Sequence, residues 1–233
     1  MIKTRLVILF CAIAILASTS SALEFRLLSW AGTIDDLKYA NGQKPVEIVA
    51  WDSALSPKYQ LTGAGPLVLF REIKQEEKTI RVPVATLPPP TGSTHAILLL
   101  SATDASNQAY TAVWIDDSPE VRKAQTITYY NLSSYPVLIK LGTEEISLAP
   151  QAMSIRATDP AFERLALKVA AQTEAGWEIV ASRSHAIRPG LRTLVILRDG
   201  RTQGNGLKDR IDFLSFNDKP PAPAPLGEPV VRP

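Results

Sequence analysis

Cysteine is almost absent from this sequence of 233 residues, in which Cys11 is the only one. Cys11 lies inside an N-terminal apolar segment, so a chain that loses this segment contains no cysteine at all. This excludes a disulfide-stapled scaffold and a zinc site built on thiolates. A remaining chain of about 200 residues is long enough to be held together by its hydrophobic core.

Histidine is also scarce, and catalytic motifs are missing. Neither His95 nor His185 has a second metal-ligating residue at a suitable spacing, and no G-x-S-x-G or phosphate-binding glycine loop is present. We therefore predict a protein that is not an enzyme and has no metal and no cofactor. A hydrolase with two carboxylates far apart in the sequence remains an open alternative, because such pairs leave no local signature.

Long apolar runs are limited to one segment, Leu6–Ala17, which is too short to span a bilayer comfortably. Lys3 and Arg5 precede it, and the small residues Ser20 and Ala22 follow it. This pattern predicts a signal peptide over residues 1–22 and an exported protein, periplasmic or extracellular, without stable membrane insertion after cleavage. An uncleaved anchor is the alternative interpretation.

An excess of charge of either sign is missing from the chain expected after cleavage. The full sequence has 25 basic and 23 acidic residues, and removing Lys3 and Arg5 leaves 23 of each. A chain without net charge has no long-range electrostatic field that would attract nucleic acid, so we do not expect nucleic acid as a partner. Envelope proteins or glycans are the expected partners, and the sequence leaves the oligomeric state open.

Proline is plentiful at the C-terminal end, residues 219–233, which reads K-P-P-A-P-A-P-L-G-E-P-V-V-R-P. Proline fixes φ and offers no N–H group, so this segment is predicted to be an extended, disordered tail or spacer. A proline-rich ligand for a partner's groove is the functional alternative.

Between these ends, short apolar segments alternate with turn residues. Ile80–Leu87, Ala96–Leu100 and Leu191–Leu197 are three such segments, and Asn41-Gly42 and Pro189-Gly190 are typical turns. This pattern predicts an all-β protein of two consecutive immunoglobulin-like β-sandwich domains, 23–120 and 121–218. One larger sandwich of about 200 residues is the rival architecture.

The two predicted domains share an order of sequence features. Y-A-N and P-V-E-I, within 39–48, resemble Y-Y-N and P-V-L-I, within 129–139. Later, I-L-L at 97–99 corresponds to V-I-L at 195–197, and W-I-D-D-S-P at 114–119 to S-F-N-D-K-P at 215–220. Internal duplication would explain this order. The pattern of proline at strand starts and glycine at turns, which β-domains commonly share, would explain it as well.

Four residues form the candidate binding surface: Trp51, Trp114, Asp116 and Asp117. Trp114 alternates with Val113 and Ile115, so it is expected to face outward if those two are buried. Exposed tryptophans can stack on sugar rings or partner side chains, although core packing is their commoner use. Asp116 and Asp117 could offer oxygens to a cation, but aspartates are equally common at turns. Asn131-Leu132-Ser133 also matches a glycosylation sequon.

The pattern Y-N-L-S-S-Y-P-V-L-I-K-L-G at 130–142 resembles openings found in a family of uncharacterised secreted bacterial tandem β-sandwich proteins. This resemblance implies a structural or binding module of the cell envelope. In gross design the chain also resembles periplasmic pilus chaperones, which implies an alternative role in assembly by strand donation. That family needs a basic pair between its domains and an alternating apolar edge strand, for which Pro66–Glu72 is the candidate. A carbohydrate-binding module is the other alternative.

Overall fold

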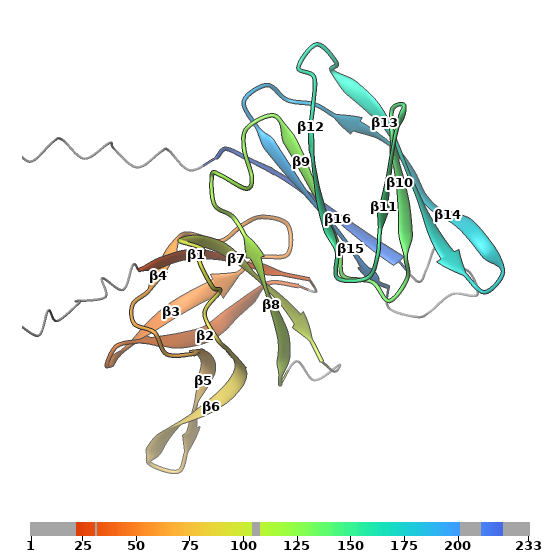
Figure 1. Cartoon of the computed structure of the whole chain (residues 1–233). Coiled ribbons are helices and arrows are strands. Elements are labelled where there is room, and N and C mark those ends of the chain that lie inside the picture. Colours follow the sequence, from red (N-terminus) through yellow and green to blue (C-terminus); the bar gives the residue numbers. More distant parts are fainter. Residues whose placement is uncertain (1–21, 31, 104–107, 201–210, 221–233) are drawn as a thin grey trace, which may run out of the picture.

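A computed structural model describes residues 22–30, 32–103, 108–200 and 211–220. Apart from Ala22, the expected signal peptide lies outside the described residues, as does most of the proline-rich tail. The described chain is all-β and forms two β-sandwiches, as predicted, rather than one larger sandwich (Figure 1).

The first sandwich consists of β1 to β8. One sheet has the strand order β4-β1-β7-β8, and the other has the order β3-β2-β5-β6. The two central strands of the first sheet, β1 and β7, pair in parallel, whereas the other pairs of this sandwich are antiparallel. The strand bounds are β1 (Leu23–Ser29), β2 (Ile34–Asn41), β3 (Lys44–Ala50), β4 (Tyr59–Leu61), β5 (Leu67–Gln75), β6 (Lys78–Leu87), β7 (His95–Ala102) and β8 (Tyr110–Asp116).

The second sandwich repeats this topology strand for strand. Its sheets have the orders β12-β9-β15-β16 and β11-β10-β13-β14, and β9 pairs with β15 in parallel, as β1 does with β7. The strand bounds are β9 (Thr126–Asn131), β10 (Val137–Leu141), β11 (Glu144–Leu148), β12 (Met153–Ala157), β13 (Arg164–Thr173), β14 (Gly176–Ala186), β15 (Arg192–Asp199) and β16 (Ile211–Asp218).

A β-bulge recurs at the same place in both sandwiches. The pairing of β5 with β6 shifts register after Leu69↔Ala85, and that of β13 with β14 shifts after Val169↔Ala181. In each case the extra residue is a valine next to an alanine, Val84 or Val180. A bulge inserts one residue at a defined position. Its recurrence at the same place therefore favours internal duplication over the alternative that the two domains merely share common strand and turn patterns.

The sequence correspondence needs correction in its first part. Tyr39 lies in β2, but Tyr129 lies in β9, the counterpart of β1, so matching them misplaces the start by one strand. The later matches fall on counterpart strands, β7 with β15 and β8 with β16. The first of these is shifted by one residue, because Ile97 pairs with Ile115 whereas Leu194, not Val195, pairs with Phe216.

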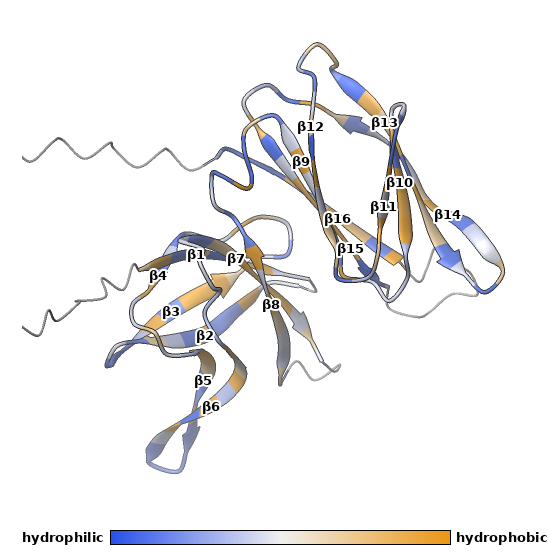
Figure 2. Cartoon of the chain, in the orientation of Figure 1, coloured by the Kyte–Doolittle hydropathy of each residue, from blue (hydrophilic) through white to orange (hydrophobic). Residues whose placement is uncertain are grey.

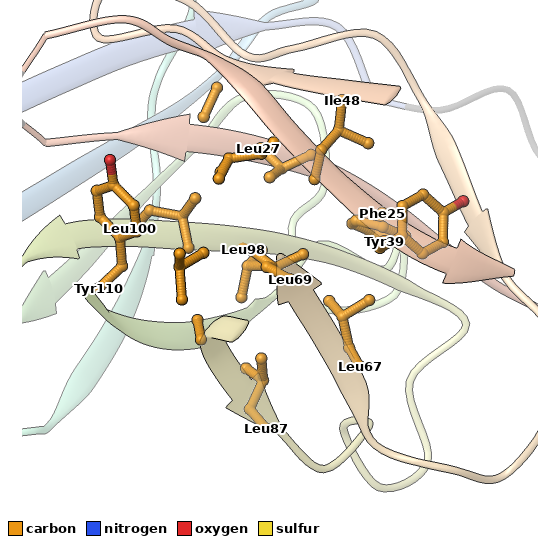
Figure 3. Close-up of a cluster of buried hydrophobic side chains, with 14 of the residues drawn as sticks. Phe25, Leu27, Tyr39, Ile48, Leu67, Leu69, Leu87, Leu98, Leu100 and Tyr110 are labelled. Carbon is orange, nitrogen blue, oxygen red and sulfur yellow. The ribbon is translucent and has the colours of Figure 1, made fainter. Parts of the chain in front are cut away.

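Each sandwich has its own apolar core, and the connecting turns are largely hydrophilic (Figure 2). In the first core, the ring of Phe25 meets that of Tyr39 edge-to-face at 5.4 Å, and leucines from β5 and β7 pack beside them (Figure 3). In the second core, Tyr129, Ile139 and Val169 occupy comparable central places and are fully buried. Successive side chains of a strand point to opposite faces of its sheet, so every second residue of these strands faces the core, and those residues are apolar.

A third apolar cluster joins the two sandwiches, and we call it the interdomain core. It is made by the outer faces of the sheets that contain β7 and β15, and its buried members are Leu28, Ile97, Leu99, Ile115, Leu194, Ile196 and Phe216. These two sheets are therefore covered on both faces. This explains why the sequence is apolar without alternation from Ala96 to Leu100 and from Leu194 to Leu197.

Candidate functional site

A cluster of five charged side chains lies at the junction of the two sandwiches, and we call it the ion cluster. It consists of Arg26, Arg122, Arg192, Asp117 and Asp218. Arg26 comes from β1, Arg192 begins β15 and Asp218 ends β16, while Asp117 and Arg122 belong to the segment between β8 and β9. The topology thus brings together residues up to 192 positions apart in the chain.

Two carboxylates bridge the three guanidinium groups. Arg26 Nη2 lies 2.6 Å from Asp117 Oδ2 and 2.8 Å from Asp218 Oδ2. Arg192 Nη2 lies 2.7 Å from Asp117 Oδ1 and 2.8 Å from Asp218 Oδ2. Arg122 pairs with Asp117 through Nη1 and with Asp218 through Nη2, the latter at 3.3 Å. Both carboxylates therefore hold both sandwiches and the connecting segment at once.

The ion cluster is buried, which makes its pairing necessary. The side chains of Arg122 and Arg192 are fully buried, and that of Asp117 is 4% exposed. Burial acts to raise the pKa of Asp218, but the hydrogen bond from Arg192 and the charges of Arg122 and Arg192 outweigh it, so this pKa lies below its usual value. A buried charge without a partner is costly, so each member depends on the others.

Backbone contacts complete the ion cluster. Arg192 Nη1 donates to the carbonyl oxygens of Asp117 and Arg122 at 3.2 and 3.0 Å, and the Asp117 N–H donates to His95 O at 3.0 Å. The connecting segment is thereby tied to β7 of one sandwich and β15 of the other. Together with the interdomain core, these contacts fix the two sandwiches relative to each other. The arrangement is suited to holding structure rather than to chemistry on a substrate.

The four residues of the predicted binding surface do not lie together. Trp51 follows β3 and is 37% exposed. Trp114 packs against the first core, with its ring edge-to-face on Phe25 and its indole N–H donating to Pro88 O at 2.8 Å. The expectation that Trp114 faces outward is therefore wrong. Its sheet is covered on both faces, so Ile115 enters the interdomain core while Trp114 enters the sandwich.

The two aspartates of that prediction have different structural roles. Asp116 accepts a hydrogen bond from the Ser118 N–H at 2.9 Å, which is the turn role expected of aspartate. Asp117 belongs to the ion cluster. Within the described residues, no group of three or more His, Cys, Asp or Glu side chains is placed to hold a metal ion.

The sequon asparagine is also structural. Asn131 is fully buried, and its amide nitrogen donates to the carbonyl oxygens of Tyr135, Leu148 and Ala149. Its Oδ1 accepts from the Ser133 N–H and hydroxyl at 3.1 and 2.6 Å. This side chain holds the turn before β10 and is not accessible for glycosylation in the folded chain.

Two pockets border the interdomain region. One, of about 230 Å³, lies between the sandwiches and is lined by Leu99, Ser101, Thr111, Val113, Leu132, Gln151 and Arg198. The other, of about 350 Å³, lies along β14 and β16 and is lined by Trp30, Val180, Ala181, Arg183, Leu197, Ile211, Asp212, Phe213 and Leu214. We call the second one the edge pocket.

Sequence reasoning missed the three arginines of the ion cluster. No local motif marks them, because their partners come from distant strands. A usable signal was nevertheless present: Asp117 and Asp218 occupy the same place in the two repeats, one residue beyond Asp116 and Asn217. Asp117 directly follows β8 and Asp218 ends β16, and both strands contribute to the interdomain core. Unbroken apolar runs in counterpart strands of both repeats are what a shared interface between two β-domains produces.

A scan against protein-family models matched none of them, and a search of curated proteins found no match to the chain. Among the residues the structure describes, no helix is long and apolar enough to cross a membrane.

Proposed function

We propose that the chain is an exported, non-enzymatic binding module of the cell envelope, in which the two β-sandwiches act as one rigid unit. The observation that supports this best is the junction, where the interdomain core and the ion cluster are both buried. Domains in one chain usually move relative to each other unless their interface is apolar and extensive. Here the interdomain core supplies an apolar interface between the two sandwiches, and the ion cluster adds buried salt bridges to it.

A rigid pair of domains is suited to binding a partner that contacts both. Association costs free energy for every segment that must be ordered, and a preset domain orientation removes that cost. Exposed apolar side chains supply contact surface on each sandwich. Ile73 is 45% exposed in the first, and Trp177 and Ile179 are 49% and 57% exposed in the second.

The proposal is tested in the native host with a C-terminally tagged chain. We expect the mature protein to begin at Leu23 by mass spectrometry, to fractionate outside the cytoplasm, and to retain one or a few specific partners after cross-linking. Phe216→Ala, which loosens the interdomain core, should reduce that retention, whereas Phe162→Ala, at an exposed site, should not. A cytoplasmic protein that retains its N-terminal segment would refute the proposal.

An assembly chaperone working by strand donation is the second candidate. Pro66–Glu72, the expected edge segment, is not an edge, because most of it forms β5, which lies between β2 and β6. The edge strand beside β5 is β6, in which Ile80, Val82 and Val84 alternate. This alternation favours the candidate, but the arginines between the domains are already paired with Asp117 and Asp218. Ile80→Lys with Val82→Lys should abolish client copurification if β6 donates the strand.

The glycan-binding alternative now depends on Trp51, because Trp114 packs in the first core. Quenching of tryptophan fluorescence by envelope glycans, lost in Trp51→Ala, is the result that would support it.

A further inference from the structure

The two sandwiches differ on the side where the last strands of their two sheets face each other, β6 and β8 in the first and β14 and β16 in the second. Because the sandwiches share one topology, the two sides can be compared position by position. In the first sandwich, β6 and β8 approach each other across the open side between the two sheets. Trp114 of β8 donates to Pro88 O there, and Arg71 donates to the hydroxyl oxygen of Tyr110 at 2.7 Å. Large side chains of the chain itself therefore close this side of the first sandwich.

Among the residues that the structure describes, the counterpart side of the second sandwich has no equivalent of Trp114 or Tyr110. The strand registers place Ile211 at the position of Tyr110 and Ser215 at the position of Trp114. Ser215 is exposed, and the counterpart strands β14 and β16 approach each other less closely than β6 and β8 do. The edge pocket, about 350 Å³, lies on this side between β14 and β16. This volume is in the range of pockets that bind ligands.

The free edges of the two sandwiches are also protected differently. β6 and β14 are each the last strand of a sheet, so each has an edge with no neighbouring strand from the described part of the chain. Directly beside the recurrent bulge, β6 has Pro83 where β14 has Ile179. Proline offers no N–H group and is a common protection of edge strands against pairing. Ile179 keeps its N–H group, and its side chain is 57% exposed.

We propose that the free edge of β14, together with the edge pocket, binds an extended peptide segment of a partner protein by strand addition. The peptide backbone pairs with β14, and alternate apolar or aromatic side chains enter the edge pocket. This inference rests on the proposed binding function and assigns it a partner chemistry. The first sandwich indicates that chemistry, because Tyr110 and Trp114 lie there at the positions of Ile211 and Ser215, and Phe213 is the aromatic ring of the second sandwich that lines the edge pocket.

Arg183 in the edge pocket favours an acidic residue in the peptide. Arg183 lies over the ring of Phe213, with 4.4 Å from its Cζ to the ring centroid. Within the described residues no carboxylate forms a salt bridge with Arg183, and Asp212 is the other charged side chain of the lining. A carboxylate next to the apolar side chains of the peptide can pair with Arg183. Backbone pairing would then supply affinity and the side-chain pocket specificity, as in other strand-addition complexes.

The test uses residues 23–233 and the fluorescein-labelled peptide Y-T-A-V-W-I-D, the sequence of β8, which carries the two rings of the first sandwich and an acidic residue. Fluorescence anisotropy should show saturable binding. Ile179→Pro should weaken it about tenfold or more, because it removes an edge N–H group and restricts the strand. Arg183→Glu should weaken it as well, most strongly at low salt.

Ile80→Pro is the matched control, since it makes the same change at an exposed isoleucine of the other edge strand, and it should leave the affinity unchanged. Circular dichroism establishes that all variants fold. The proposal is overturned if the peptide does not bind at about 1 mM, if a scrambled peptide binds equally well, or if folded Ile179→Pro binds like the wild type. A wild-type dimer that Ile179→Pro dissociates would also overturn it, because a second copy would then occupy the edge.

These outcomes are separate from those of the proposed function. If partners are still retained from the envelope in a way that depends on the interdomain core, while the peptide fails, the binding function stands and strand addition at β14 is wrong.

Discussion

At the scale of single residues, the ion cluster contains three buried charged side chains, Asp117, Arg122 and Arg192. Three arginines share two aspartates in a buried junction, so neither aspartate can be lost without leaving buried cations short of a counter-charge. A buried ion pair need not stabilise a protein more than apolar residues would, but breaking one is costly. Stability should therefore be most sensitive to substitution of those charged residues whose partners are buried away from water.

Asp218→Asn should lower the free energy of unfolding by about 3–5 kcal/mol, the usual range for breaking a buried ion pair. The asparagine keeps the volume of the side chain but not its charge. Asp36→Asn is the control, because Asp36 pairs with Arg71 while 57% exposed, and surface pairs contribute about 1 kcal/mol or less. Urea unfolding measures both, and equal losses would show that the ion cluster does not depend on charge.

The same carboxylate predicts a dependence on acid. The pKa of Asp218 is lower in the folded chain than the ordinary value of 3.8, so its stabilising contribution is complete above that value and is lost as the pH falls below it. The stability difference between the wild type and Asp218→Asn should therefore shrink as the pH falls from about 4 to about 2. A difference that stays constant over this range would contradict the assignment.

His185 should make stability depend on pH in a higher window. Burial, and then the charge of Arg164, lower the pKa of His185 below its ordinary 6.5. The unfolded chain then binds the proton first, so stability is greatest above pH 6.5 and decreases as the pH falls below it. His185→Gln should flatten this part of the stability profile measured by urea unfolding, and an unchanged slope would exclude His185 as its cause.

At the scale of secondary-structure elements, the hairpin turns and the bulges decide which faces the strands present. The turn between β10 and β11 begins at Gly142, whose φ is +60°, a conformation that costs other residues free energy. A Cβ atom there would also lie 3.6 Å from Leu165 Cδ2, which is an ordinary contact. The cost of replacing this glycine is therefore one of backbone conformation rather than of space.

Gly142→Ala should destabilise the chain by about 1 kcal/mol, the usual penalty for a left-handed conformation in a residue with a Cβ atom. Gly65→Ala is the control, because a Cβ atom at Gly65 meets nothing within 4 Å and its φ is not in the left-handed region. Thermal unfolding followed by circular dichroism should separate the two variants, and identical melting curves would show that the turn tolerates the change.

At the scale of the whole molecule, the interdomain core couples two sandwiches that each have a complete core of their own. Calorimetry of the wild type should show one cooperative transition. Phe216→Ala should separate it into two, because the variant removes a ring that is 6% exposed between the sheets and has no place in either sandwich core. Ile73→Ala, at an exposed position, should keep the single transition, and a single transition in both variants would argue against coupling through this interface.

The strands were predictable because each repeats a short local pattern. Ile80–Leu87 and Ala96–Leu100 were recognised from their apolar residues and bounding turns, and both lie within strands of the structure. The orientation of Trp114 was not predictable, because alternation tells which residues share a face but not whether the opposite face is also covered. The ion cluster was missed for a related reason, since its members meet only after two sandwiches have packed together.

The sequence by itself determined the class of fold, the presence of two similar halves and the approximate positions of their strands, because these follow from local periodicity and turn chemistry. Tertiary structure alone decided that the halves share a buried junction, that Asp117 and Asp218 bind three arginines, and that Trp114 closes one sandwich while Ser215 leaves the other open. The physical reason is distance along the chain: contacts between residues about 100 positions apart depend on how whole sheets pack, and no local pattern records that.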